Sequence, residues 1–394
     1  MFLNRRGFLF ASAGLMVAPA LAADWQTTLQ AAKGQTVYFN AWAGSDTINA
    51  YIAWVGDEVK ARYGVTLEHV KITDAAEVVR RVRDEVKAGK TDGSVDLVWI
   101  NGENFRAMKM DKLLFGPFAA DLPNFKLVDT EGKPTTLNDF AEPTEGLESP
   151  WGMAQLTFFA DGAKVKSPPL SLADLISYAQ ANPGRVTYPA PPDFHGTTFV
   201  KQVFNETVSD KSMFAQPISK QEFTGKAQLL TDILDLMHPH LWREGKQFPQ
   251  SQSQVKQMVA DGELLIGLTF NPNEPANLVA TGEMPASTIA WQHKGGTIGN
   301  THFVAIPINS KSSAAAQVVA DFLLSPQAQA RKADLKQWGD PTVLAMSKLS
   351  PEEVKLFGSG NAPGAVSLPG PAIPEPHGSW VPLIETAWLE RYGG

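Results

Sequence analysis

The sequence predicts an α/β protein built from two lobes. Three strand–helix units follow one another between residues 37 and 104, a pattern typical of a parallel sheet with right-handed crossovers. Turn residues at 142–150 interrupt this pattern, and a second series of strands and helices begins after them. We therefore expect a first lobe, a crossing point near residue 150 and a second lobe with a sheet of its own.

The first unit combines a buried strand, a helix start and a helix stop. Residues 37–42 are mostly apolar, as in a buried strand, and Ser45 or Asp46 can cap the following helix. Gly64 ends that helix. The residues of its apolar face recur at three- and four-residue spacing: Ile48, Tyr51, Ile52, Val55 and Val59.

The next two units repeat this order. A strand at 65–72 precedes the capping box Asp74-x-x-Glu77, which opens a helix with a face of valines. The strand at 95–100 is largely apolar, as expected when both faces are covered, and Asn101 follows it at the start of another helix.

The second part of the chain has its own signals. Strands are expected at 185–189, 264–270 and 301–308, and helices after Ser171 and Ser219 and at 314–324 and 326–336. The tail at 358–380 is rich in Gly and Pro, so we expect it to form a strap over the surface.

The first 22 residues predict export. Arg5 and Arg6 precede an acid-free apolar stretch that is too short to span a bilayer, and small residues then favour cleavage after Ala22. The paired arginines before Phe-Leu resemble a twin-arginine signal, with an ordinary secretory leader as the alternative. Either leader places the mature chain outside the cytosol, and we expect it in a periplasm.

Composition excludes several kinds of protein. The chain has no cysteine, so a lipid anchor on cysteine, disulfides and thiolate metal sites are excluded. The formal net charge is -7, and loss of the leader removes two arginines and no acid, giving -9. This charge opposes nucleic-acid binding, which depends on cationic contacts to phosphate.

The usual motifs of catalysis are absent. Gly89-Lys90-Thr91 lacks the earlier glycine of a phosphate-binding loop, and no dinucleotide, hydrolase or zinc-protease motif occurs. His238 and His240 flank a proline at a helix end, which is more typical of a turn than of a metal site. We expect no catalytic residue, no metal and no cofactor.

Polar and aromatic residues gather where buried strands end. Such loops lie at 41–46, 101–105 and 271–274. In open parallel sheets, ligands bind beyond the carboxyl ends of the strands, next to helix N-termini. These three loops are the predicted binding region, although residues such as Ser45 and Asn101 can equally be simple helix caps.

These same loops carry a resemblance to a known family. The runs Ala41-Trp42-Ala43-Gly44, Trp99-Ile100-Asn101-Gly102-Glu103-Asn104 and Ser149-Pro150-Trp151-Gly152, with the later segments 296–307 and 314–329, resemble extracellular solute-binding proteins of ABC importers, in particular their YnjB-like branch. The resemblance covers essentially the whole mature chain. It implies the type II periplasmic-binding-protein fold, in which two parallel-sheet lobes enclose a ligand cleft. It also implies no catalysis, and a membrane permease with its ATPase as partners.

The organisation expected on this basis has five parts: the export signal at 1–22, the first part of lobe 1 at 23–150, lobe 2 at 151–292, a return to lobe 1 at 293–345, and the strap with a short helix at 346–394. We expect a monomer.

Ligand contacts are nominated from both lobes. Those of lobe 1 are Trp42, Ser45, Asn101, Glu103 and Phe105, with Trp151 near the crossing point. Those of lobe 2 are Tyr188, Phe194, Thr197, Thr198, Asn271 and Glu274. A core position is the alternative for Tyr188 and Phe194, and Trp99 is expected in the core.

Aromatic rings beside carboxylates favour a cation, so we expect a small polar or cationic organic solute, such as an amine or a thiamine-like heterocycle. A carbohydrate is the second choice, because Trp and Tyr stack on sugar rings while acids and amides bond hydroxyls. An exported glycoside hydrolase using Glu103 or Glu274 remains an alternative, and it requires a partner carboxyl at a fixed separation.

Overall fold

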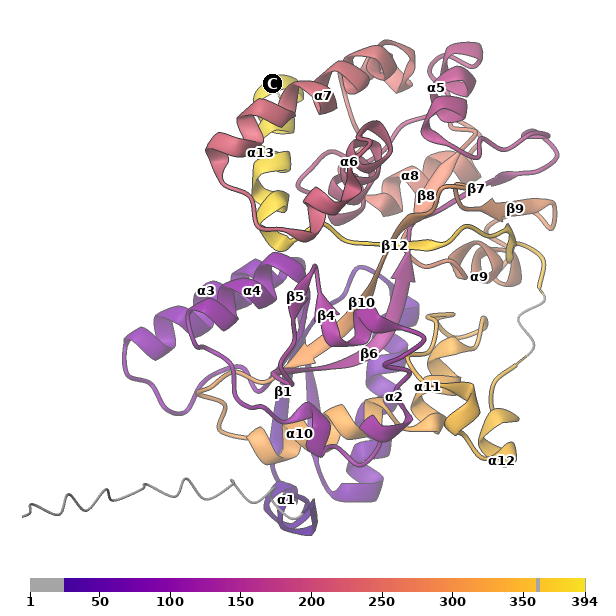
Figure 1. Cartoon of the computed structure of the whole chain (residues 1–394). Coiled ribbons are helices and arrows are strands. Elements are labelled where there is room, and N and C mark those ends of the chain that lie inside the picture. Colours follow the sequence, from indigo (N-terminus) through magenta and orange to yellow (C-terminus); the bar gives the residue numbers. More distant parts are fainter. Residues whose placement is uncertain (1–24, 359–361, 394) are drawn as a thin grey trace, which may run out of the picture.

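The computed structural model describes residues 25–358 and 362–393. The chain forms two lobes, one above the other in Figure 1, and each lobe has a sheet and hydrophobic core of its own. The predicted leader at 1–22 and its cleavage after Ala22 lie outside the described residues.

The sheet of lobe 1 has six strands in the order β12-β10-β3-β1-β2, with β6 also paired to β10. Its strands are β1 (Thr36–Trp42), β2 (Thr66–Ile72), β3 (Leu97–Ile100), β6 (Glu148–Gln155), β10 (Thr297–Ala305) and β12 (Ala372–Pro374). β1 is parallel to β2 and β3, as the strand–helix units predict. β10 is antiparallel to β3 and β6, because the chain that returns from lobe 2 enters the sheet from the opposite direction.

Helices cover both faces of this sheet. Leu97 and Val98 are neighbours on β3 and point to opposite faces, so they belong to different cores, one with α2 and α10 and the other with α3 and α4. The five apolar positions predicted for the first helix are all buried on α2, and Gly64 ends it with φ 69°. The helices are α1 (Trp25–Ala32), α2 (Asp46–Tyr63), α3 (Ala75–Lys87), α4 (Gly102–Met110), α10 (Ser313–Leu323) and α11 (Pro326–Ala333).

The sheet of lobe 2 has the order β11-β9-β7-β8. Its strands are β7 (Thr157–Asp161), β8 (Gly267–Thr269), β9 (Thr288–Trp291) and β11 (Val366–Leu368). β7 is antiparallel to β8 and β9, so parallel pairing in this sheet is confined to β9 with β11. The helices of this lobe are α5 (Leu172–Ala181), α6 (Phe194–Thr207), α7 (Lys220–Met237), α8 (Gln252–Ala260), α9 (Glu274–Ala280) and α13 (Val381–Tyr392).

One local expectation for lobe 2 was wrong, and one helix was not predicted. Residues 185–189 do not form a strand, and α6 had no sequence prediction. The side chain of Asp193 caps α6 by accepting bonds from the N–H groups of His195 and Gly196. The apolar period is hidden because residues 196–205 are all buried, on every side of the helix, and polar residues are among them. Among the helices of the described ranges, none has the length and apolar character needed to cross a membrane.

The C-terminal tail is more than a surface strap. β11 adds to the sheet of lobe 2, and β12 adds to that of lobe 1. Trp380, directly before α13, and Trp388, within it, are buried in the core of lobe 2 together with residues of α6 and α7.

The lobes are joined where the two sheets meet. β6 ends at Gln155 and β7 begins at Thr157, so the outgoing chain changes sheets within a few residues. At this point the Leu156 N–H donates to the carbonyl of Ile298, next to the returning strand β10. The junction therefore consists of paired strands, with β12 alongside β10 (Figure 1).

Candidate functional site

The interface between the lobes holds a buried ammonium group. Lys201 lies on α6 of lobe 2, and its side chain is only 1% exposed. Its Nζ lies 4.6 Å from the ring centroid of Phe140, in the turn between β4 (Asn138–Asp139) and β5 (Glu142–Pro143) of lobe 1. It lies 5.7 Å from the ring centroid of Phe194, also on α6. Both rings attract the ammonium through their quadrupoles.

Carboxyl groups from both lobes lie near this ammonium, and we call them the carboxyl cluster. Four of them interact with Lys201, and Glu148 joins them through its interaction with Asp139: Glu103, Asp139, Glu148, Glu375 and Glu385. Glu375 contacts Lys201 directly, with Oε2 2.6 Å from Nζ. The other Glu375 oxygen accepts from Asn300 Nδ2 at 3.1 Å. The cluster thus has more acidic groups than the single ammonium can neutralise.

Two members of the carboxyl cluster are incompletely bonded. Asp139 Oδ2 accepts from the Gly102 N–H at 2.6 Å, but Oδ1 accepts no hydrogen bond from the described residues. Neither oxygen of Glu148 accepts one from them either. Each of these two acids is 1% exposed. Burial raises the pKa of both well above the ordinary value, because an ionised carboxylate without partners is costly there.

Glu103 lies at the contact between α4 of lobe 1 and the short helix η8 (Gly378–Trp380) next to α13. A Cβ on Gly378 would lie 3.2 Å from the Glu103 Cα, so the two segments pack backbone against backbone. Burial in this contact raises the pKa of Glu103 to about 7. The nearby Glu385 and Glu375 also raise it, while a backbone N–H and Lys201 oppose the shift.

A second set of interlobe contacts lies between α9 and the segment after α11. Asn271 Nδ2 donates to the Trp338 carbonyl at 3.1 Å, and Asn273 Nδ2 donates to the Gly339 carbonyl at 2.7 Å. Trp338 belongs to the core of lobe 1. We call Asn271 and Asn273 the amide latch, because their bonds hold lobe 2 against lobe 1.

The segment gripped by the amide latch is fixed by a buried ion pair. Lys332 Nζ bonds Asp340, whose other oxygen lies 3.0 Å from His302 Nε2. A Cβ on Gly152 would lie 2.0 Å from Asp340 Oδ2, so only glycine fits at that position of β6. These contacts set the path of residues 338–340 and hence the carbonyls that the latch reaches.

In the predicted binding loops at the ends of β1 and β3, the polar side chains do not cap the helices that follow. Neither Ser45 nor Asn101 caps its helix through its side chain. Ser45 Oγ bonds Thr47 Oγ1 at 2.9 Å, and Asn101 Nδ2 donates to the Thr301 carbonyl at 2.9 Å. Trp42 is half-buried beside the core of lobe 1, with Gly44 folded against its indole. The helix-cap alternative is therefore wrong for these two side chains.

Three nominated aromatic residues are core residues, which corrects the prediction for them. Phe105 is fully buried among the residues of α3 and α4. Trp151 is fully buried in the core of lobe 1, in contact with the ring of Trp99 at 5.0 Å. Tyr188 is fully buried in lobe 2, where its hydroxyl lies 2.7 Å from His238 Nε2. A solute cannot reach these rings without unpacking a core.

The remaining nominations from lobe 2 have differing surroundings. Phe194 is 43% exposed at the interface, whereas Thr198 is fully buried within α6. Thr197 Oγ1 donates to Glu385 Oε1 at 2.8 Å, which links it to the carboxyl cluster. Glu274 at the start of α9 accepts from Gln252 Nε2 at 3.0 Å, so it supports α8. Asn271 belongs to the amide latch, and Thr198 is corrected to a core position.

The sequence prediction missed Lys201, Phe140 and Glu375. One signal was available, because Lys201 is the one charged side chain within residues 196–205 of α6 and so requires a partner if that stretch is buried. Its partner Glu375 lies 174 residues away, in the tail predicted to be a strap, and no local pattern connects the two.

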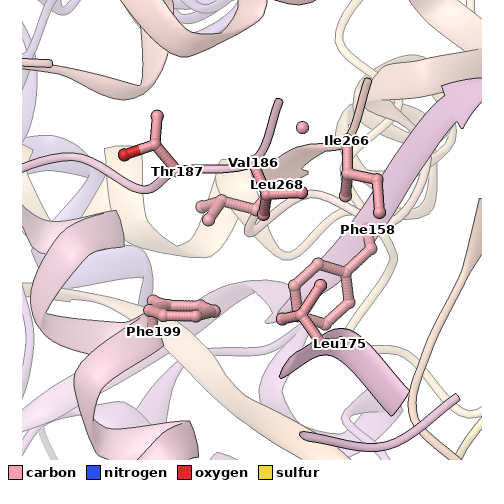
Figure 2. Close-up of a pocket in the computed structure, with 8 residues that line it drawn as sticks. Phe158, Leu175, Val186, Thr187, Phe199, Ile266 and Leu268 are labelled. Atoms are coloured by element: carbon pink, nitrogen blue, oxygen red, sulfur yellow. The ribbon is translucent and has the colours of Figure 1, made fainter. Parts of the chain in front are cut away.

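The described residues also contain two hollows away from the carboxyl cluster. Figure 2 shows a cavity of about 10 Å³ inside lobe 2, lined by Phe158, Leu175, Val186, Thr187, Phe199, Ile266, Gly267 and Leu268. It has space for roughly one water molecule and belongs to the core. A larger hollow of about 280 Å³ lies between α8 and the end of α9. No group of three or more metal-ligating side chains occurs in residues 25–358 and 362–393.

Comparison with known proteins agrees with this architecture. The family model of bacterial extracellular solute-binding proteins matches residues 54–355 of the chain. Protein YnjB of Escherichia coli K12 is 45% identical over 388 residues, which is 98% of this chain and 98% of YnjB.

Solved structures share the fold at low sequence identity. The periplasmic binding protein AfuA from Actinobacillus pleuropneumoniae, with fructose-6-phosphate bound, has a TM-score of 0.60 and 15% identity over 91% of this chain and 99% of its own. PotD from Streptococcus pneumoniae, a spermidine/putrescine ABC transporter substrate-binding protein, has a TM-score of 0.61 and 13% identity over 90% and 98%. These likenesses confirm the two-lobed binding-protein fold. With the family pattern and the 45% identity to YnjB, they lead to one conclusion: the chain belongs to the bacterial extracellular solute-binding proteins.

Proposed function

We propose that this protein captures a small cationic organic solute between its lobes in the periplasm and delivers it to the permease and ATPase of an ABC importer. Export is supported by the leader signals around Arg5 and Arg6. Delivery to an importer follows from the family resemblance, and no catalytic step is part of the proposal.

The observation that carries the solute class is the charge balance at the lobe interface. The carboxyl cluster brings five acids together with Lys201, and two of the acids have oxygens without a hydrogen-bond partner in the described residues. Burial raises the pKa of these carboxyl groups and so disfavours their ionised forms, and a cation entering between the lobes would pair with the carboxylates and offset that cost. The exposed Phe194 ring offers apolar surface for its organic part.

Contacts between the solute and both lobes would explain why the solute favours the closed form. A solute shifts the equilibrium between open and closed forms only by binding the closed form more tightly. Moving that equilibrium from 1:99 to 99:1 requires about 5.5 kcal/mol of differential binding. Glu103 from lobe 1 and Glu385 from lobe 2 act on each other electrostatically, so a cation near them meets both lobes at once.

The fold does not select the solute, because the similar structures include a spermidine/putrescine protein and one with fructose-6-phosphate bound. The solute class must therefore be inferred from the residues at the lobe interface. The carboxyl cluster would repel a sugar phosphate, which supports a cation in preference to an anion.

Calorimetry on protein unfolded in urea, dialysed and refolded tests this proposal. The panel contains monoamines, diamines, quaternary ammonium compounds, thiazolium heterocycles, neutral sugars and sugar phosphates. We expect saturable binding of at least one cation and none of the phosphates. Binding of sugars together with silence toward every cation would reject the cationic class. Recovery of the bound compound unchanged, checked by mass spectrometry, is expected for a carrier, whereas turnover would support the hydrolase alternative.

A further inference from the structure

We propose that Lys201 is a tethered substitute for the solute's cationic group: in the closed protein without solute, its ammonium occupies the place between Phe140 and Phe194 where a ligand ammonium binds. The proposal rests on the proposed function, since it assigns a position to the cation.

The first argument is the origin of the groups around the ammonium. Phe140 is fixed to lobe 1, because its ring lies against Gly102 and the neighbouring Asp139 accepts from the Gly102 N–H. Lys201 and Phe194 come from α6 of lobe 2. The ammonium therefore gains its contact with Phe140 only when the lobes are closed, as expected of a ligand that holds them together.

The second argument is the chemistry of the place. An ammonium over two rings, with one carboxylate at 2.6 Å, is the environment that proteins use to bind amines. Asp139 Oδ1 and both Glu148 oxygens, each on a side chain 1% exposed, have no hydrogen-bond partner in the described residues. These free oxygens show that the tethered ammonium does not exhaust the acceptors of the carboxyl cluster.

The third argument concerns the loss of Lys201. Removing one member of a buried ion pair leaves the other charge uncompensated. Without the ammonium, Glu375 and its neighbours can be rehydrated by opening the lobes. The variant without the ammonium should therefore be open when no cation is supplied, and it should close when a cation of the same size is added.

The test is chemical rescue of Lys201→Ala, which removes the aminopropyl group beyond Cβ. Lys220→Ala, an exposed lysine on α7 of the same lobe, is the matched control. The probe is n-propylammonium, with n-propanol as its neutral counterpart. Closure is followed by the radius of gyration in small-angle scattering, and affinity by calorimetry.

We expect Lys201→Ala to be more expanded than wild type and Lys220→Ala to match wild type. Propylammonium should restore the compact form and bind the variant at least tenfold more tightly than it binds wild type, and propanol should do neither. Equal compactness of all three proteins, or an equal response to amine and alcohol, would overturn the proposal. If Lys201→Ala does not fold, Lys201→Met keeps the apolar stem, and a compact ligand-free Met variant gives the same negative answer.

The outcomes separate the two proposals. Rescue by propylammonium, with wild type silent toward all cations of the calorimetric panel, would show that an amine can occupy the place of the Lys201 ammonium, but it would reject the cationic solute and with it the role of Lys201 as its substitute. Cation binding by wild type, with no opening and no rescue in the Lys201 variants, would reject the tethered ammonium alone.

Discussion

The Lys201 ammonium lies 2.6 Å from a carboxylate oxygen of Glu375, although 174 residues separate the two in the chain. This pair joins α6 of lobe 2 to the C-terminal tail beside the strands that link the lobes. We therefore expect contacts at the lobe interface, and not only the loops at the strand ends, to control the opening and closing of the lobes.

Replacing aromatic residues should separate core from interface positions. Trp151→Ala should lower the free energy of unfolding by about 3–5 kcal/mol, because a fully buried indole is lost from the core of lobe 1. Phe194→Ala should lower it by less than about 1 kcal/mol, since that ring is 43% exposed and mainly contributes a contact with an ammonium. Urea denaturation measures both, and equal losses would contradict these placements.

Removing the amide latch should favour the open form. Asn271→Ala with Asn273→Ala deletes two interlobe hydrogen bonds, each contributing about 0.5–1.5 kcal/mol. We expect a larger radius of gyration in solution without ligand, and an unchanged value for Asn138→Ala, which changes an exposed amide of lobe 1. An unaltered radius in the double variant would show that these bonds do not hold the lobes.

Closure without ligand should depend on pH. The pKa of Glu103 is raised from 4.5 to about 7 in the closed protein, where it faces Lys201, Glu375, Glu385 and Asp139. A raised carboxyl pKa means that closing takes up a proton, so closure is favoured at low pH and weakens as pH rises from about 4.5 to 7.

A bound cation should have the opposite pH dependence, because it favours the ionised carboxylate and its binding to the closed protein releases the proton that Glu103 holds there. We expect cation affinity to rise over the same range, by at most about tenfold per pH unit for each proton released. Scattering and calorimetry at about pH 5 and pH 8 provide the measurement, and Glu103→Gln is expected to flatten both trends. The same slope in wild type and Glu103→Gln would assign the effect to other groups.

Loss of the ion pair in lobe 1 should be costly. Asp340→Ala leaves Lys332 buried without its partner, which should destabilise the protein by about 3–5 kcal/mol. Gly152→Ala places a methyl group against the same carboxylate and should cost about 1–3 kcal/mol. Urea denaturation gives both values, with the exposed Asp92→Ala as the control. Near-native stability of Asp340→Ala would mean that Lys332 finds another partner.

Local periodicity was sufficient to predict the first three strand–helix units. The spacing of Ile48, Tyr51, Ile52, Val55 and Val59 reflects burial along one face of α2, and each of these residues is buried. Gly64 ended the helix as expected, because it adopts the left-handed conformation that favours glycine.

Local sequence patterns predicted the candidate site less well. Phe105 follows a predicted strand and Trp151 lies near the predicted crossing point, but whether a ring points to a core or to a cleft depends on packing that sequence spacing does not contain. Lys201 and Glu375 meet only through the tertiary fold. The helix α6 lacks a clear apolar period because it is buried on all sides and its buried residues include Lys201 and Gln202. Local patterns therefore predicted the secondary structure well and the interlobe charges poorly.

The position of α13 has a consequence for biosynthesis. The core of lobe 2 includes Trp380, Ile384 and Trp388, and the core of lobe 1 includes Leu344 and Leu349. A growing chain on the ribosome cannot complete either core until most of its length has been translated. Nascent intermediates will therefore expose unfinished apolar surface, and chaperones will have a long interval in which to hold the chain before it folds.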